Sequence, residues 1–203
     1  MTNQGDITML TRNRIIERTV HLKEKGYANL KNDSGGETMW GITTATAAKH
    51  KDLWPKYDFN GDMKRLPLAM AYEIYVLDYW EAQSLDDVLR ISPMLAEELF
   101  DTGVNCGTEL PQVSLQRCLN VLNGQGKYYK DLTVDGDVGP NTIKALTAFF
   151  ELRGNEGIAV LFTMLNSIQS VYYIELAEKK ETQEDFVYGW NRSRVFMNLV
   201  THL

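Results

Sequence analysis

Apolar side chains recur at helical spacing along most of this chain, and one turn-rich stretch interrupts them. Ile15, Ile16 and Val20 begin the pattern, and Gly26 follows as a stop signal. Residues 27–43 are instead rich in glycine, asparagine and aspartate, a composition typical of turns and of a short hairpin. The sequence therefore predicts a mainly α fold with a small β-hairpin region near its N-terminus.

Further helices follow from the same spacing and from residues that begin or end helices. Pro67 introduces one of them, while Ser92 and Pro93 supply an N-cap and a first helical residue for another. We expect Gly103 to end that second helix. The expected helices span residues 43–51, 68–80, 93–102, 111–122, 140–152, 157–179 and 184–203.

Length and charge narrow the classes of protein. The 203 residues, 44% hydrophobic and 24% charged, suffice for one good-sized domain or two small ones. The net charge is −6, with +2 in residues 1–53 and −8 in residues 54–203. A nucleic acid is a poor partner for such a chain, because phosphate binding needs clustered Lys and Arg. We expect no nucleic-acid partner.

Cysteine content and hydropathy indicate a chain without a disulfide framework or an export signal. Cys106 and Cys118 are too few for such a framework, and we expect both thiols to be reduced. Residues 1–20 are too polar for a signal peptide, and no segment is expected to reach the length that spans a bilayer. The sequence thus predicts a protein made in the cytoplasm, with no stable membrane insertion.

Glu24 is the strongest candidate for a catalytic acid. It follows Ile16 and Val20 at intervals of four, so an α-helix would place it on the apolar face. It also falls in the last helical turn, where the helix dipole disfavours a carboxylate. Burial and the dipole both raise the pKa of such a carboxyl group, and a protonated carboxyl can protonate a leaving sugar oxygen.

A second carboxylate lies in the turn-rich stretch. Asp33 sits in a polar segment that keeps it ionised, and an acid and a carboxylate in contrasting environments are what glycoside hydrolysis requires. An Asx-turn is the alternative role for Asp33. Glu37 competes for the same position, although we expect it to form a structural salt bridge. Thr38 either contributes its hydroxyl to catalysis or bonds a neighbouring strand.

Three motifs together resemble the signature of glycoside hydrolase family 108, N-acetylmuramidases of bacteria and phages with a lysozyme-like fold. They read Glu-Lys-Gly-Tyr at 24–27, Asn-Asp at 32–33 and Gly-Gly-Glu-Thr-Met-Trp-Gly-Ile-Thr at 35–43. The chain departs from the family pattern at Lys25, where glycine is usual. The resemblance implies Glu24 as general acid, with Asp33 and Thr38 positioning or activating water.

The C-terminal half carries motifs that resemble the peptidoglycan-binding region accompanying this family. They are Phe-Asp-Thr-Gly-Val-Asn-Cys-Gly at 100–107, Val-Asp-Gly-Asp-Val-Gly-Pro-Asn-Thr at 134–142 and Gly-Trp-Asn-Arg at 189–192. The resemblance implies a lysozyme-like catalytic region in residues 1–97. A helical peptidoglycan-binding region in residues 98–203 would pack against it.

The expected function is that of an endolysin-type lysozyme. It would cleave the β-1,4 bond between N-acetylmuramic acid and N-acetylglucosamine in bacterial peptidoglycan and so cause lysis. Tyr27 and Trp40 would stack on sugar rings, unless they pack in the core, and Gly35 and Gly36 would let the backbone approach the substrate. We expect a monomer that uses no cofactor and no metal.

Several alternatives stay open at this point. A lytic transglycosylase would use Glu24 alone and make an anhydro product, whereas a non-catalytic peptidoglycan-binding protein would release no fragments. A secretion-system effector would share the muramidase chemistry. The enzyme would act in the periplasm or cell wall after holin-dependent or secretion-system release. Retaining and inverting outcomes are both compatible with the sequence, because they depend on the separation of the carboxyl groups.

Overall fold

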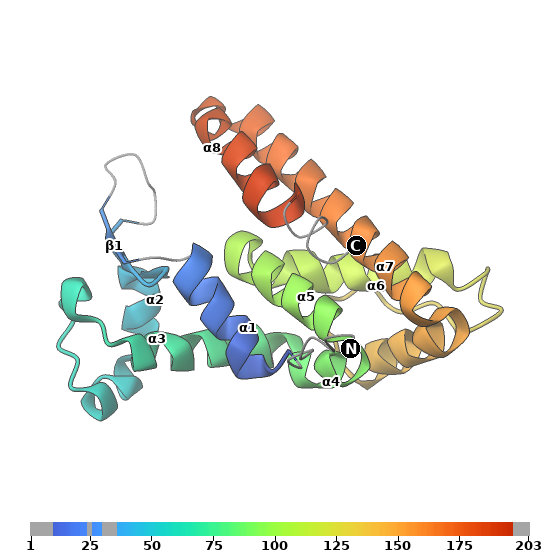
Figure 1. Cartoon of the computed structure of the whole chain (residues 1–203), viewed down its shortest axis with the longest axis horizontal. Coiled ribbons are helices and arrows are strands. Elements are labelled where there is room, and N and C mark those ends of the chain that lie inside the picture. Colours follow the sequence, from blue (N-terminus) through green and yellow to red (C-terminus); the bar gives the residue numbers. More distant parts are fainter. Residues whose placement is uncertain (1–9, 24–25, 30–35, 197–203) are drawn as a thin grey trace, which may run out of the picture. The chain divides into compact units, whose positions relative to one another are not determined.

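The computed structural model describes residues 10–23, 26–29 and 36–196 (Figure 1). It confirms the prediction of a mainly helical protein with one small sheet. The chain divides into two compact units between Asp78 and Tyr79. Each unit is described by itself below.

Unit 1 combines short helices with the sheet. Its elements are α1 (Arg12–Arg18), the π-helix η1 (Thr19–Lys23), β1 (Tyr27–Ala28), β2 (Thr38–Met39), β3 (Ile42–Thr43), α2 (Thr44–Lys49), the 3-10 helices η2 (Lys51–Leu53), η3 (Pro55–Tyr57) and η4 (Met63–Arg65), and α3 (Leu68–Tyr75). The three strands form one antiparallel sheet in the order β1-β2-β3. The expected hairpin is therefore part of a three-stranded sheet. Thr11 and Thr43 cap α1 and α2 through their side chains.

Among its described residues, unit 2 consists of helices joined by loops, the longest of which lies between α6 and α7. The π-helix η5 (Val76–Trp80) leads into it from α3, so helical structure runs over 68–80 as predicted. Its further elements are the 3-10 helix η6 (Glu81–Gln83), α4 (Leu85–Ile91), α5 (Pro93–Cys106), α6 (Glu109–Leu122), α7 (Pro140–Lys179), the 3-10 helix η7 (Glu181–Gln183), α8 (Glu184–Trp190) and the π-helix η8 (Asn191–Phe196). α8 lies along the second half of α7 (Figure 1).

The expectation that Gly103 ends α5 is wrong. The helix continues to Cys106, and Gly107 follows it with a positive φ of 84°. A Cβ on Gly103 would lie 2.3 Å from Nε2 of Gln83. Gly103 therefore serves close packing rather than helix termination, a role that spacing along the chain does not reveal.

Helix α7 unites the two expected helices 140–152 and 157–179, with a kink between them. Gly154 adopts non-helical dihedrals there (φ 58°, ψ −151°). By length and composition alone α7 would suffice to cross a membrane, contrary to the expectation that no segment does, and 44% of its most apolar window is buried. Its inward side chains include Leu146, Phe149 and Leu161, and a buried core helix meets the same criterion.

Both cysteines are free thiols, as expected. Burial is the main cause that raises the pKa of Cys106 and of Cys118 to about 11. Both groups are therefore thiols rather than thiolates at neutral pH.

Candidate active site

The sheet places two of the candidate residues on opposite faces. Thr38 lies in the central strand, opposite Ala28 of β1 and Thr43 of β3, while Tyr27 pairs with Met39. Successive side chains of a strand point to opposite faces, and directly paired residues share a face. Thr38 and Tyr27 consequently face different sides of the sheet.

Tyr27 belongs to a polar cluster on its own face. Its hydroxyl donates to Oε1 of Glu37 at 2.7 Å, and Nδ2 of Asn29 donates to the same oxygen at 3.4 Å. Nζ of Lys64 lies 5.4 Å from the centre of the Tyr27 ring. The hydrogen bond to Glu37 is the largest cause of a raised Tyr27 pKa, so the phenol stays protonated.

The same contacts describe Glu37. Its carboxylate accepts from Tyr27 and Asn29, and its backbone carbonyl accepts from the Thr44 amide at 3.1 Å. Glu37 thus links β1, the start of β2 and the N-terminus of α2. Its contacts with described residues are hydrogen bonds, and the expected salt bridge stays a prediction.

Trp40 occupies the turn between β2 and β3. It and Gly41 have positive φ angles of 55° and 76°, the combination of a type I′ hairpin turn. A bulky residue rarely adopts such a φ. Three hydrogen bonds hold it there: its amide donates to the Gly26 carbonyl at 3.2 Å, its Nε1 donates to the Leu66 carbonyl at 3.2 Å, and its carbonyl accepts from the Tyr75 hydroxyl at 2.8 Å.

These bonds give Trp40 a framework role. The side chain is half-buried, and its one donor is used inside the protein. Stacking on a sugar ring stays a prediction for this residue. For Tyr27, whose side chain is 36% exposed, part of the ring is open to a ligand.

Of the four remaining candidates, one lies within the described residues and three lie outside them. Gly36 is exposed and has a φ of 68°, which suits glycine. Glu24, Asp33 and Gly35 lie outside the described residues, so the catalytic trio stays a prediction. The apolar stripe that predicted the position of Glu24 holds as far as Val20, which is fully buried.

One local feature before Glu24 differs from expectation. The helix that begins at Arg12 changes to π geometry over Thr19–Lys23. The i→i+5 bonds of a π-helix shift the faces relative to α-helical spacing, and such segments are frequent at functional sites. The interval of four from Val20 therefore does not by itself place residue 24.

Sequence reasoning missed Asn29, Lys64 and Tyr75. Lys64 and Tyr75 reach the sheet from η4 and α3. Because these contacts join distant positions, neither periodicity nor local motif indicates them. No group of three or more His, Cys, Asp or Glu side chains that would suit a metal ion occurs among the described residues.

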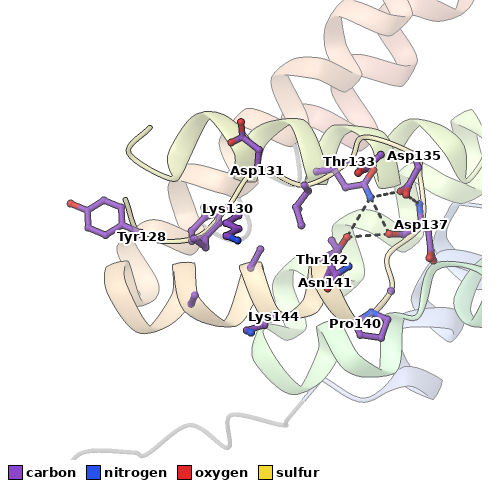
Figure 2. Close-up of a pocket in the computed structure, with 16 residues that line it drawn as sticks. Tyr128, Lys130, Asp131, Thr133, Asp135, Asp137, Pro140, Asn141, Thr142 and Lys144 are labelled. Atoms are coloured by element: carbon purple, nitrogen blue, oxygen red, sulfur yellow. Dashed lines mark hydrogen bonds between the residues drawn. The ribbon is translucent and has the colours of Figure 1, made fainter. Parts of the chain in front are cut away.

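The second motif, residues 134–142, consists of a loop, tied to helix α6, and the first residues of α7. Gln116 Nε2 donates to Asp135 Oδ1 at 2.8 Å and to the Asp137 carbonyl at 3.0 Å, while Gln116 Oε1 accepts from the Gly136 amide at 2.9 Å. Thr142 donates to the Asp137 carbonyl at 3.1 Å. The Gln116 hydrogen bond is the largest cause that lowers the Asp135 pKa. The residues of this motif therefore fix the loop that enters α7 (Figure 2).

The Gly-Trp-Asn-Arg motif is structural. The Trp190 ring lies 5.3 Å from that of Tyr173 and 5.6 Å from that of Phe186. Asn191 accepts from the Ser170 hydroxyl at 2.7 Å, and buried Arg194, which follows the motif, donates to Asp101 at 2.8 Å. The motif fastens α8 and η8 to α7.

Two family models match the chain and together cover most of it. Residues 17–107 match Glycosyl hydrolase 108, and residues 110–195 match the Predicted Peptidoglycan domain. These matches confirm the resemblance expected from the motifs. The family regions meet between residues 107 and 110, whereas the compact units meet at residue 78. The expected boundary between 97 and 98 lies between these two positions and stays a prediction.

A solved structure shows the same fold. The chain is similar to the structure of Brucella abortus SagA, with a TM-score of 0.65 and 21% sequence identity over 95% of this chain and 97% of that one. This likeness confirms the predicted lysozyme-like fold. No curated protein matches the sequence at a significant level.

Proposed function

We propose that this chain, which matches Glycosyl hydrolase 108 over residues 17–107 and the Predicted Peptidoglycan domain over residues 110–195, is an N-acetylmuramidase. It is a glycoside hydrolase that acts on peptidoglycan. The bond we assign to it is the β-1,4 linkage between N-acetylmuramic acid and N-acetylglucosamine. The observation that carries this assignment is the set of family motifs around Glu24, all within residues 17–107.

Glu24 is the general acid in this proposal. It comes directly after the η1 segment in the sequence, and the proposal requires a surrounding that favours its protonated carboxyl. Its proton goes to the glycosidic oxygen as the C1–O bond breaks and positive charge develops at C1. The oxygen of a water molecule bonds to C1, and the proton that this water loses passes to a carboxylate.

Asp33 and Thr38 act on the water side of the reaction. Thr38 lies in the central strand, where pairing with β1 and β3 fixes its backbone. Asp33 follows β1 in the sequence and supplies the ionised carboxylate. The separation between the Glu24 and Asp33 carboxyl groups decides between a retaining and an inverting outcome.

Tyr27 and Glu37 support the site rather than the chemistry. Glu37 holds the Tyr27 hydroxyl, and Lys64 lies near the ring. In this proposal the saccharide contacts the exposed part of Tyr27, and Gly35 and Gly36 keep the role expected from the sequence. Trp40 keeps the β2–β3 turn in place through its three hydrogen bonds.

The biological role that suits this activity is bacterial lysis. A monomer made in the cytoplasm would reach the periplasm or wall after holin-dependent release, as an endolysin does. Delivery by a secretion system is the second route. Release of cytoplasmic contents from host cells that co-express a holin, and its absence without one, tests the first route.

The test of the activity compares wild type with Glu24→Gln on purified peptidoglycan. Glutamine keeps the shape of the side chain but donates no proton, so turbidity loss should slow by about 10²–10⁴-fold. Glu17→Gln is the matched control, because Glu17 is an exposed glutamate of α1, and it should leave the rate unchanged. Equal rates for wild type and Glu24→Gln would contradict the proposal.

A further inference from the structure

Unit 2 contains a pocket of about 600 Å³ within the peptidoglycan domain. One wall is the loop over residues 128–139, and the other is the first turns of α7 (Figure 2). Gln116 of α6 contributes to the lining. The established family match does not say which part of peptidoglycan such a pocket would bind.

The loop wall is preformed, because two side chains of α6 and that of its C-cap residue Asn123 hold it. Asn120 donates to the Leu132 carbonyl at 2.9 Å and accepts from the Leu132 amide at 2.7 Å. Asn123 donates to Asp131 at 2.5 Å, and Gln116 holds Asp135 at 2.8 Å. A pocket with fixed walls binds a ligand without the cost of ordering a loop.

Two cations line the pocket from different walls. Lys130 comes from the loop and Lys144 from α7, and both are exposed. Among the described residues neither has an ion-pair partner closer than 4.0 Å. The start of α7 lies between them in sequence and adds the positive end of a helix dipole. This combination suits a carboxylate ligand.

Three aspartates also line the pocket, and at least two of them are engaged by the protein. Asp135 accepts from Gln116 and from the Asp137 amide, and Asp131 accepts from Asn123. The Asp137 side chain lies against Gly139, where a Cβ would approach its Oδ2 to 2.9 Å. The lining therefore offers both signs of charge, which suits a ligand with carboxylates and an ammonium group.

The two aromatic side chains of the pocket are partly engaged within the protein, although Tyr128 remains 40% exposed. The Tyr128 ring packs against Gly124, where a Cβ would lie 2.7 Å from the ring. Nζ of Lys127 lies 5.3 Å and Cζ of Arg153 lies 5.9 Å from the centre of the same ring. Tyr129 donates its hydroxyl to the Leu119 carbonyl at 2.9 Å. The charged side chains, rather than these rings, are therefore the main binding groups of the pocket, and charged groups match the peptide part of the wall.

We propose that this pocket binds the peptide stem of peptidoglycan, with stem carboxylates at Lys130 and Lys144 and a stem ammonium group near Asp131 and Asp137. The proposal rests on peptidoglycan as the substrate of the chain. The stem anchors the enzyme to the wall through its own charges, while the glycan strand is left to the catalytic region. Binding through such charge-assisted bonds weakens with salt.

The test is a calorimetric titration of the full chain with the synthetic stem tripeptide L-alanyl-γ-D-glutamyl-L-lysine. Wild type should bind it saturably, and Lys130→Gln or Lys144→Gln should each weaken binding about tenfold. Lys180→Gln, an exposed lysine at the end of α7, is the matched control and should bind as wild type does. Unchanged melting temperatures will show that the variants fold.

Three results would overturn the proposal: no tripeptide binding by wild type, equal affinity in the pocket variants, or competition by the peptide-free glycan chitotetraose. This proposal and the proposed function can fail independently of each other. Lys130-dependent tripeptide binding by a chain that fails to cleave wall material would leave this inference standing and the muramidase assignment wrong. Muramidase activity without tripeptide binding would do the reverse.

Discussion

Arg194 and Asp101 form a buried ion pair although 93 positions separate them in the sequence. Nη1 of Arg194 donates to Oδ1 of Asp101 at 2.8 Å, and the two side chains are 7% and 2% exposed. Asp101 belongs to the glycosyl hydrolase 108 region and Arg194 to the peptidoglycan domain. The last part of the hydrolase region and the peptidoglycan domain therefore share one folded unit.

Replacing Arg194 with methionine should destabilise that unit by about 3–5 kcal/mol, because the buried Asp101 carboxylate loses its guanidinium. Urea unfolding followed by circular dichroism measures the change. Arg192→Met, at an exposed position of the same helix, should stay within about 0.5 kcal/mol of wild type. Adding Asp101→Asn to Arg194→Met should recover part of the loss. A change below about 1 kcal/mol in Arg194→Met would contradict the account.

A fragment that ends at residue 109 should fail to fold over α4 and α5. These helices pack against α6 and α7, which the fragment lacks, so Leu95, Leu99 and Phe100 would become exposed. Hydrogen exchange, read segment by segment, should find α4 and α5 protected in the full chain and unprotected in the fragment. A fragment of residues 79–203 should retain the protection. Protection of α5 in the shorter fragment would show that the family boundary is also a folding boundary.

Tyr75→Phe should loosen the β2–β3 turn. The change removes the hydroxyl that donates to the Trp40 carbonyl, and we expect a loss of about 1 kcal/mol in the free energy of unfolding. Tyr188→Phe provides the control, because Tyr188 is 79% exposed. Chemical denaturation of both variants checks the prediction. If the two changes were equally mild, the bond from Tyr75 would not hold Trp40 at its positive φ.

Mutation should distinguish the roles of Glu37 and Asp33, the two carboxylates of the turn-rich stretch. In Glu37→Gln the amide oxygen still accepts from Tyr27 and Asn29, so the rate of peptidoglycan cleavage should stay within about threefold of wild type. Asp33→Asn removes the charge on the water side and should slow cleavage by about 10²-fold or more. Initial rates on purified peptidoglycan decide. The opposite ranking would make Glu37 the second catalytic carboxylate.

Local signals in the sequence predicted much of the fold. Pro67, Ser92 and Pro93 indicate helix starts that the structure has at the expected residues, because caps and proline geometry act within one turn. Gly103 was misread for lack of tertiary context, because it accommodates Gln83 rather than ending a helix. The break expected between residues 152 and 157 is a kink at Gly154 within α7.

The motifs predicted which region of the chain holds the candidate site, but they did not predict the tertiary contacts around it. Tyr27 and Gly36 flank the segments that carry Glu24 and Asp33, and the family match supports that region. Lys64 and Tyr75 join it only through tertiary folding, and the pairing of Arg194 with Asp101 arises in the same way. Such contacts leave no periodicity in the sequence, since each depends on the path of the whole chain.

The most direct test of the central claim is mass spectrometry of the fragments that the enzyme releases from peptidoglycan in H₂¹⁸O. We expect fragments with N-acetylmuramic acid at the reducing end, each carrying one ¹⁸O from water, and none from Glu24→Gln. Anhydro products without the label, reducing-end N-acetylglucosamine, or labelled muramic acid products from Glu24→Gln would contradict a muramidase that uses Glu24.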